Sequence, residues 1–319
     1  MDDGSAHRSS DEKSQRSDEE ATHRSGERKA SRSGEAKSPR SGEAKSPRSG
    51  EQKTPRSGEQ KTQRRGKQDR SSAGDPVRTL ELLWRMSSSP APVRGPRQKS
   101  SVDAVVAAAI EIADAEDIGA LTMRAVASKL GLTPMATYTY VPGKAELIDL
   151  MVDKVYGEMD RANLSNLPWR ERVATIAVEN RTMLTRHPWV AYLPTTRPPL
   201  GPGMAAKYDH ELRAFEGLGL DDVTIDASLT YVLGFVTSVA RIAIDTARAA
   251  ADSAMSDHQW WERAAPLLAQ VFDAKRFPVG ARVGSTAGQT YDSAYSADHA
   301  YEFGLARVLD GLAQLIEKH

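Results

Sequence analysis

The chain has 319 residues, a formal net charge of zero and no cysteine. The lack of cysteine excludes disulfide frameworks, thiolate zinc sites and cysteine nucleophiles. No uninterrupted apolar run reaches the length of about 18 residues that indicates a transmembrane helix, and the N-terminus lacks the apolar core of a signal peptide. We therefore expect a cytoplasmic protein of about two domains, with no membrane partner.

Residues 1–75 are predicted to form a disordered tail. They contain almost no Leu, Ile, Val or Phe and are rich in Ser, Gly, Arg, Lys and Glu, a composition that cannot offset the entropy lost on ordering. An eight-residue repeat of the type RSGEAKSP runs through the tail, and it has no apolar positions with which to build a solenoid core. The excess of Lys and Arg suggests a weak tether to DNA phosphates. An inert solvated extension accounts equally well for the same composition.

Residues 76–97 are predicted to be a linker. The stretch RTLELLWRM has the spacing of a short amphipathic helix, with Leu80, Leu83 and Trp84 on its apolar side. The proline-rich chain after it is basic around RGPRQK. Such a segment is either a basic arm of the kind that homeodomains insert into the minor groove, or a linker that happens to be basic.

A DNA-binding domain is predicted over residues 98–160. Its first helix begins at the cap-like sequence SSVD, which starts at Ser100, and its apolar residues repeat at helical spacing until the chain nears Gly119. A further helix, predicted from Lys144 to about Arg161, should join this small domain to the rest of the chain.

Residues 121–140 are predicted to form a helix–turn–helix. Thr122 is placed to cap the first helix and Gly131 to end it, while Thr133 and Pro134 are suited to start the second. The second helix ends after about two turns and would not be stable alone. A helix–turn–helix explains it, because its second helix is presented to the major groove.

The sequence LTMRAVASKLGLTPMATYTYVPGKAEL resembles the DNA-binding motif of tetracycline-repressor-type (TetR/AcrR) regulators. The residues that carry this resemblance are Thr122, Arg124, Tyr138, Tyr140 and Lys144. It implies a homodimer whose two recognition helices enter successive major grooves of a near-palindromic double-stranded DNA operator.

Each residue of the motif has an expected role in DNA binding. Tyr138 and Lys144 are expected to grip phosphates, and Arg124 to reach a guanine edge or a phosphate. Thr139 stands where relatives often have a large or basic residue, so more weight falls on phosphates and DNA shape. Tyr140 has an alternative role, which is to pack against the following helix. The residues expected to point outward from the second helix are Met135, Ala136, Thr139 and Tyr140, and the full predicted set of DNA-binding residues adds Thr122, Arg124, Thr133, Tyr138 and Lys144.

Residues 161–319 are predicted to form an all-α domain for ligand binding and dimerisation. Apolar spacing indicates helices over about 169–186, 204–216, 221–251, 258–272 and 299–318, whereas the Gly/Ser-rich residues 280–289 are predicted to be a break. The resemblance implies that the long helix and the last helix of each subunit form a four-helix interface between subunits.

A cluster of aromatic and methionine side chains in this half is the predicted ligand site. Such side chains with a few polar tips are typical of a small-molecule cavity between helices, although plain core packing explains any single one of them. The resemblance implies an inducer held there that changes the spacing of the two recognition helices. The predicted ligand-binding residues are Met183, His187, Trp189, Tyr192, Met204 and Tyr208.

An enzyme is the main rival class, and its motifs are weak. The G-x-G-x-x-A pattern over residues 201–206 does not follow a strand, as a dinucleotide-binding loop must. His258 and Glu262 have the spacing of metal ligands but no obvious further ligand. We expect no enzymatic activity, cofactor or metal. The prediction is a ligand-responsive transcriptional regulator, expected to act as a repressor released by a small hydrophobic inducer; the alternative is an architectural DNA-binding protein driven by its basic repeat tail.

Overall fold

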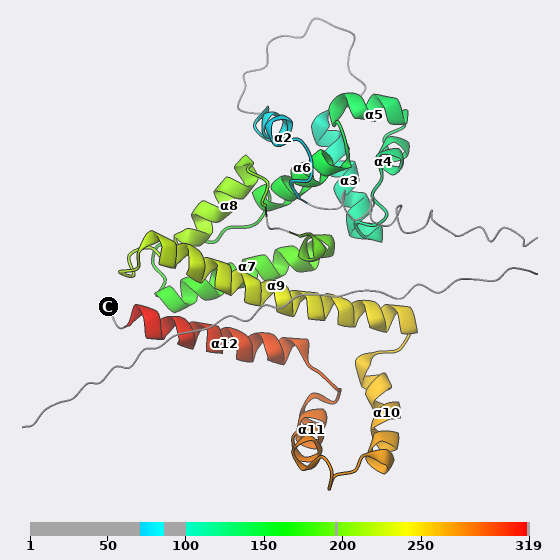
Figure 1. Ribbon diagram of the computed structural model, residues 1–319, viewed down its shortest axis with the longest axis vertical. Coiled ribbons are helices and arrows are strands. Elements are labelled where there is room, and N and C mark those ends of the chain that lie inside the picture. The colour runs from blue at the N-terminus through cyan, green and yellow to red at the C-terminus, as the bar shows by residue number, and fades with distance from the viewer. Residues whose placement is uncertain (1–70, 86–99, 195–196, 318–319) are drawn as a thin grey trace, which may run out of the picture. The chain divides into compact units, whose positions relative to one another are not determined.

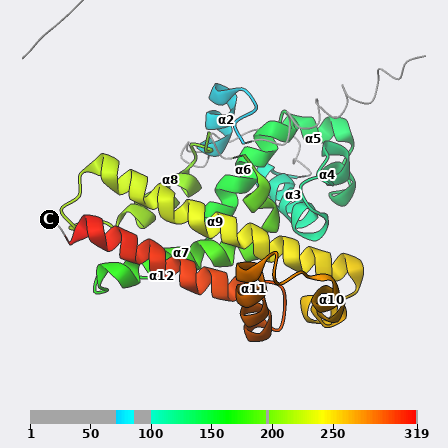
Figure 2. The same cartoon turned by 60° about the horizontal axis from the view of Figure 1, so that its bottom comes forward.

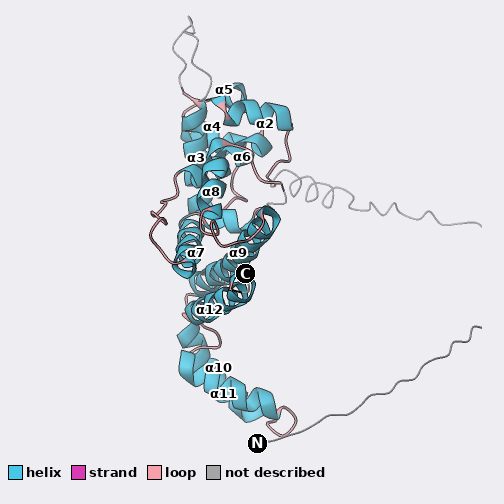
Figure 3. Cartoon of the chain, turned by 90° about the vertical axis from the view of Figure 1, so that its left-hand side faces the viewer, coloured by secondary structure: helices cyan, strands magenta, loops and turns pink. Residues whose placement is uncertain are grey.

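The computed structural model describes residues 71–85, 100–194 and 197–317. Every regular element in these residues is helical and none is a strand (Figure 3), which confirms the all-α prediction. The repeat tail up to residue 70 and the basic stretch RGPRQK up to residue 99 lie outside the described residues. The elements in chain order are α2 (Pro76–Leu83), α3 (Val102–Glu116), α4 (Met123–Lys129), α5 (Pro134–Tyr140), α6 (Lys144–Gly157), α7 (Trp169–Arg186), the 3-10 helix η2 (Pro188–Tyr192), α8 (Pro202–Leu212), α9 (Asp222–Ser253), α10 (Asp257–Val271), α11 (Pro278–Tyr291) and α12 (Ala297–Ile316).

The helices α3 to α6 enclose one small apolar core. Val105 of α3, Val126 of α4, and Leu147, Ile148 and Met151 of α6 are all fully buried in it. The helix α3 begins at its predicted cap, where the Ser101 hydroxyl accepts a hydrogen bond from the backbone N–H of Ala104. Because α6 carries this core on one side and contacts α8 on another, it ties α3, α4 and α5 to the C-terminal half.

The helix α2 lies on α6, and only part of its predicted apolar side is buried. Leu83 is 2% exposed, but Leu80 and Trp84, predicted to share its apolar side, are 37% and 40% exposed. The helix begins earlier than expected, because the Asp75 carboxylate accepts bonds from the N–H groups of its first turn. The Trp84 indole donates to the carbonyl of Leu200 instead of packing in the core, at 2.8 Å.

In the C-terminal half, α9 packs against both α7 and α12 (Figures 1 and 2). The helix α7 has the predicted bounds, and the Asp221 carboxylate caps α9 as predicted. By length and composition α9 could cross a membrane, since its most apolar stretch has a mean hydropathy of 1.6. Its packing against α7, α8 and α12 gives that apolar surface a place within a helical bundle.

The predicted break over residues 280–289 is wrong, because these residues form most of α11. Pro278 occupies the first turn of α11, where its missing N–H costs nothing. Gly288 faces Trp261 of α10 so closely that a Cβ there would come within 2.6 Å of the indole ring. A glycine is thus required at residue 288, where it lets α11 pass close to Trp261, although glycine lowers helix stability by about 1 kcal/mol.

Candidate functional site

The helix–turn–helix is built by the local interactions that its sequence predicts. The Thr122 hydroxyl accepts from the N–H of Ala125 at 3.0 Å, and the Thr133 hydroxyl accepts from the N–H of Ala136 at 3.2 Å. Between the helices, Gly131 has a φ of +64°, a left-handed backbone conformation that residues other than glycine adopt only at a cost in free energy. Two capped helices and one glycine turn therefore fix the orientation of α5 relative to α4.

The helix α5 buries one side and exposes the other. On the inner side of α5, Thr137 is fully buried. On the outer side, Met135 is 76% exposed, Tyr138 is 45% exposed, and Thr139 is also exposed. Ala136 is half-buried. On the supporting side of the motif, Thr122, Arg124 and Thr133 are exposed. The outward surface of the motif thus offers a methionine, a phenol, hydroxyls and a guanidinium.

The predicted outward orientation of Tyr140 is wrong. Its ring is half-buried against the core of the domain, and its hydroxyl accepts a hydrogen bond from the N–H of Ser100 at 3.2 Å. The reason is position: Tyr140 ends α5 next to the fully buried Val141, where the chain turns inward toward α6. Lys144, the first residue of α6, is half-buried, and its Nζ lies 3.4 Å from the carbonyl of Ile118.

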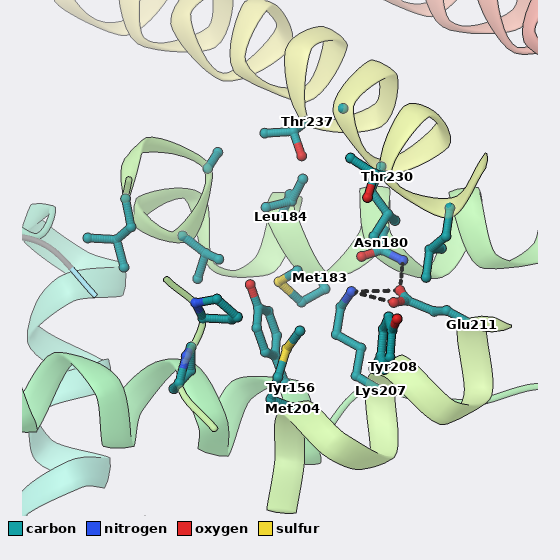
Figure 4. A pocket seen from close by; sticks show the side chains of 18 of the residues that line it. Tyr156, Asn180, Met183, Leu184, Met204, Lys207, Tyr208, Glu211, Thr230 and Thr237 are labelled. Carbon is teal, nitrogen blue, oxygen red and sulfur yellow. Dashed lines mark hydrogen bonds and ion pairs between the residues drawn. The ribbon is translucent and has the colours of Figure 1, made fainter. Parts of the chain in front are cut away.

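A cavity of about 870 Å³ opens among α6, α7, α8 and α9 (Figure 4). This volume is within the range of ligand pockets for drug-sized molecules, which is roughly 300–1,000 Å³. Three of the six predicted ligand-binding residues line it: Met183 from α7, and Met204 and Tyr208 from α8. Tyr208 also donates from its hydroxyl to the Asp226 carboxylate at 2.6 Å.

The other three predicted residues point away from the cavity. The Trp189 indole donates to Oδ1 of Asp114 in α3 at 2.7 Å, and Nδ1 of His187 lies 2.8 Å from the same oxygen. The Tyr192 hydroxyl donates to Asp245 of α9 at 2.6 Å. These residues flank or occupy η2, whose tight turns spread neighbouring side chains in different directions. Closeness in sequence therefore did not give a shared cavity.

The structure adds a buried polar group that the sequence analysis missed. Nζ of Lys207 lies 2.6 Å and 2.8 Å from the two carboxylate oxygens of Glu211, and the Asn180 amide donates to Oε1 of Glu211 at 2.5 Å. Burial lowers the pKa of Lys207, although the charge of Glu211 opposes this shift. Burial, assisted by Glu211, raises the pKa of Tyr156 to about 12. The only sequence signal was an i, i+4 Lys–Glu pair, which normally indicates a solvated helix face.

A chain of contacts joins the cavity to the helix–turn–helix domain. Ala191 of η2 lines the cavity, and its carbonyl accepts from Nε of Arg241, which also lines it. Two residues before Ala191 along η2, Trp189 is anchored on Asp114 near the end of α3. A second link lies nearby, where the guanidinium of Arg248 pairs with the carboxylate of Asp117 at 2.7 Å.

The second junction between the halves is the crossing of α6 and α8. The Asp153 carboxylate accepts from the N–H of Met204 at 2.8 Å, and burial raises the pKa of Asp153 although these backbone bonds oppose the shift. A Cβ added to Gly203 would lie 1.9 Å from the carbonyl oxygen of Asp153. The backbone of α8, which lines the cavity, therefore touches the backbone of α6, which shares its core with α3 and α4.

Trp189→Phe should lower the free energy of unfolding by about 2 kcal/mol, as urea denaturation would measure. The substitution takes the indole donor from Asp114 and leaves a void at a residue that is 0% exposed. Trp84→Phe is the matched control: it also removes one indole N–H, but from an exposed ring that donates to a carbonyl. Its cost should stay below about 1 kcal/mol, since water replaces the lost bond. Equal costs for the two variants would contradict the anchoring role of Asp114.

Comparison with known proteins places the chain among transcriptional regulators. The family described as "Tetracyclin repressor-like, C-terminal domain" matches residues 164–316. The HTH-type transcriptional repressor DrrR1 of Streptomyces coeruleorubidus is 36% identical over 250 residues, which cover 78% of this chain and 89% of that protein. Apo ActR from Streptomyces coelicolor has a similar structure, with a TM-score of 0.55 and 25% identity over 72% of this chain and 99% of ActR. A structure of ActR in complex with actinorhodin matches with a TM-score of 0.55 and 26% identity over 70% of this chain and 98% of ActR.

Proposed function

The chain belongs to the tetracycline-repressor family of transcriptional regulators, and we propose that it represses transcription from a near-palindromic operator. It binds this operator as a homodimer and releases it when a small, largely apolar molecule fills the cavity. Under this proposal, residues 98–160 form the DNA-binding domain and residues 161–319 the ligand-binding and dimerisation domain. The protein acts in the cytoplasm, where its DNA partner is. The architectural alternative is less favoured, because it assigns no task to the cavity.

The observation that carries the proposal is the chain of contacts that runs from the cavity through η2 to α3, on which the helix–turn–helix packs. Ala191 and Arg241 face the cavity, while Trp189, in the same short helix as Ala191, is bound to Asp114 of the DNA-binding domain. A ligand that displaces η2 would move α3, and with it α4 and α5, which pack on α3. The coupling required is modest, since 1–3 kcal/mol corresponds to a roughly 5–150-fold change in DNA affinity.

On the DNA side, the exposed face of the motif is the proposed reading surface. Met135 offers apolar contact to a thymine methyl, and hydroxyls can bond to base edges or phosphates. Lys144, at the start of α6, is proposed to contact a phosphate, and its Nζ also lies 3.4 Å from the carbonyl of Ile118. Tyr140 is proposed to position the start of α3 rather than to touch DNA. The proposed contact residues are Thr122, Arg124, Thr133, Met135, Ala136, Tyr138, Thr139 and Lys144.

The proposed dimer surface lies on α9 and α12. These helices pack together, yet Tyr231 of α9 and Phe303 of α12 are more than half exposed, and Ile242 and Leu315 are also exposed. Apolar side chains at such density on two adjacent helices favour burial against a second copy of the same surface. Two copies would bring two recognition helices to one operator.

The mass of the protein–DNA complex tests this proposal. The duplex carries the sequence that the protein selects from a random duplex pool. Light scattering coupled to gel filtration should show two chains bound per near-palindrome. Adding a second copy of the binding sequence should add two chains. Binding whose stoichiometry grows steadily with duplex length, whatever its sequence, would contradict the proposal and support an architectural protein that coats DNA.

A further inference from the structure

The cavity has a polar wall that the stability of the helical bundle does not require. Lys207, Glu211 and Asn180 are 5%, 1% and 4% exposed, and the three are joined by the bonds described above. Replacing a buried ion pair with apolar residues of similar volume is often neutral or stabilising. The pair is therefore better explained by what the cavity holds than by the packing of α7 against α8.

The charges on the cavity wall balance one another. Lys207 and Arg241 line the cavity together with Glu211 and Asp226. A ligand carboxylate at this wall would meet the deeply buried Glu211, and a ligand ammonium would meet Lys207. An uncharged ligand avoids both costs. If it carries a carbonyl and a hydroxyl, it can accept from the Lys207 ammonium and donate to the Glu211 carboxylate.

Hydroxyl groups continue the polar wall along the cavity. Thr230, Thr237 and Ser238 of α9 and Tyr156 of α6 line it, and none of their hydroxyls makes a hydrogen bond with any of the described residues. Figure 4 shows Thr230 and Thr237 facing the same space as Tyr156 and Lys207. By contrast, the hydroxyl of Ser228, on the same helix but not on the cavity wall, donates to the carbonyl of Thr224 at 2.7 Å. These four hydroxyls have no partner within the described part of the chain, so each can donate a hydrogen bond to an oxygen of a ligand in the cavity, or accept one from it.

The remaining wall is apolar. Met183, Leu184, Met204, Leu229 and Leu233 line it, and methionine sulfur makes favourable contacts with aromatic rings. Between Thr230 and Thr237, Gly234 leaves the wall open, since a Cβ there would meet nothing within 4 Å. A drug-sized hydrophobic framework therefore fits between the polar groups.

We propose that the cavity binds an uncharged, polyoxygenated hydrophobic molecule, with a carbonyl held by Lys207, a hydroxyl held by Glu211, and further oxygens bonded to Tyr156 and to the α9 hydroxyls. This proposal rests on the proposed function, in which the cavity holds the effector. It names the effector by its chemistry: several carbonyl or hydroxyl oxygens on an apolar skeleton, without a formal charge.

Calorimetric titration of the full chain with three compounds of one skeleton tests the proposal. The probes are 9,10-anthraquinone, 2,6-dihydroxyanthraquinone at pH 6 with its hydroxyls protonated, and the anion anthraquinone-2-carboxylate. The dihydroxy compound should bind at least about tenfold more tightly than either of the others. It adds one or two hydrogen bonds of about 1 kcal/mol each, and about 1.4 kcal/mol corresponds to a tenfold change in affinity. Equal binding of anthraquinone and its dihydroxy derivative, tightest binding of the carboxylate, or no binding of any probe would each overturn the proposal.

Variants separate the polar wall from the cavity as a whole. The double variant Lys207→Met/Glu211→Leu should weaken the binding of anthraquinone, whose carbonyl loses the Lys207 donor, and should weaken the binding of the dihydroxy compound more, so that the preference falls to within about threefold. Thr230→Val/Thr237→Val should weaken the same preference without disturbing the ion pair, and Ser228→Ala should leave it intact. A preference that survives in both double variants would refute the assignment.

The outcome for the ligand class can be told apart from the outcome for the proposed function. Operator binding by the same protein samples is measured in parallel. If the protein binds a specific operator and releases it with anthraquinone as readily as with the dihydroxy derivative, the proposed function is supported and the proposed ligand class is refuted. If the protein prefers the dihydroxy compound but binds no specific DNA sequence, the proposed ligand class is supported and the proposed regulatory function is refuted.

Discussion

Tyr138→Ala should weaken operator binding by about thirtyfold while leaving the dimer and its helical content unchanged. Tyr138 is 45% exposed on α5 and does not belong to the hydrophobic core, so its removal should not unfold the domain. Each dimer loses two contacts of about 1 kcal/mol, and about 2 kcal/mol corresponds to this loss of affinity. Fluorescence anisotropy with a labelled operator duplex measures it.

Two further variants define what Tyr138 does. Tyr138→Phe removes only the hydroxyl, so it shows how much of the loss comes from a hydrogen bond rather than from the ring. Tyr295→Ala removes a similarly exposed tyrosine (41%) from the chain that joins α11 to α12, and it should bind DNA normally. Full-strength operator binding by Tyr138→Ala would show that α5 does not dock on DNA as proposed.

The nature of the Arg124 contact can be read from the salt dependence. If Arg124 binds a phosphate, Arg124→Ala should weaken binding to all sequences and reduce the slope of log affinity against log salt by about one for each lost contact. If it reads a guanine, the variant should relax the preference at one position of each half-site instead.

Gly203→Ala should lower the free energy of unfolding by about 3 kcal/mol. The new methyl group would lie 1.9 Å from the Asp153 carbonyl oxygen and 2.9 Å from the backbone nitrogen of Gly157, and backbone atoms cannot rotate away as a flexible side chain can. Either α8 separates from α6 or both helices distort, and overpacking of this kind costs about 1–3 kcal/mol or more. Urea denaturation followed by circular dichroism measures the change.

Gly157→Ala is the matched control at the same crossing. Its Cβ would approach the Gly203 Cα at 3.5 Å, an ordinary van der Waals distance. The variant should therefore change stability by less than about 1 kcal/mol. If Gly203→Ala were equally harmless, α6 and α8 would not be in direct backbone contact, and the proposed mechanical link between cavity and DNA-binding domain would lose one of its two junctions.

The sequence was sufficient to predict those elements whose signals are local. The caps at Thr122, Thr133 and Asp221 and the glycine turn at Gly131 each depend on residues that are neighbours in the chain. The helix α7 was predicted with its observed bounds because breakers flank it on both sides. The same signals placed α5 on a helix–turn–helix and thereby led to the family.

The errors arose where contacts between distant residues decide the outcome. Residues 280–289 look like a break until Trp261 is seen against Gly288. His187 and Trp189 look like part of a ligand site until Asp114 of α3 is seen to bind them both. The Lys207–Glu211 pair looks like a solvated helix face, and only the tertiary structure shows that it is buried in the cavity wall.

Selection of bound sequences from a random duplex pool is the measurement that tests the central claim most directly. It uses the purified full chain at near-physiological salt, because affinities at low salt exaggerate binding without sequence preference. A regulator of the proposed kind should enrich a near-palindrome whose half-sites lie about one helical turn apart, matching two α5 helices in successive major grooves. Strong binding without any enriched motif would contradict that claim.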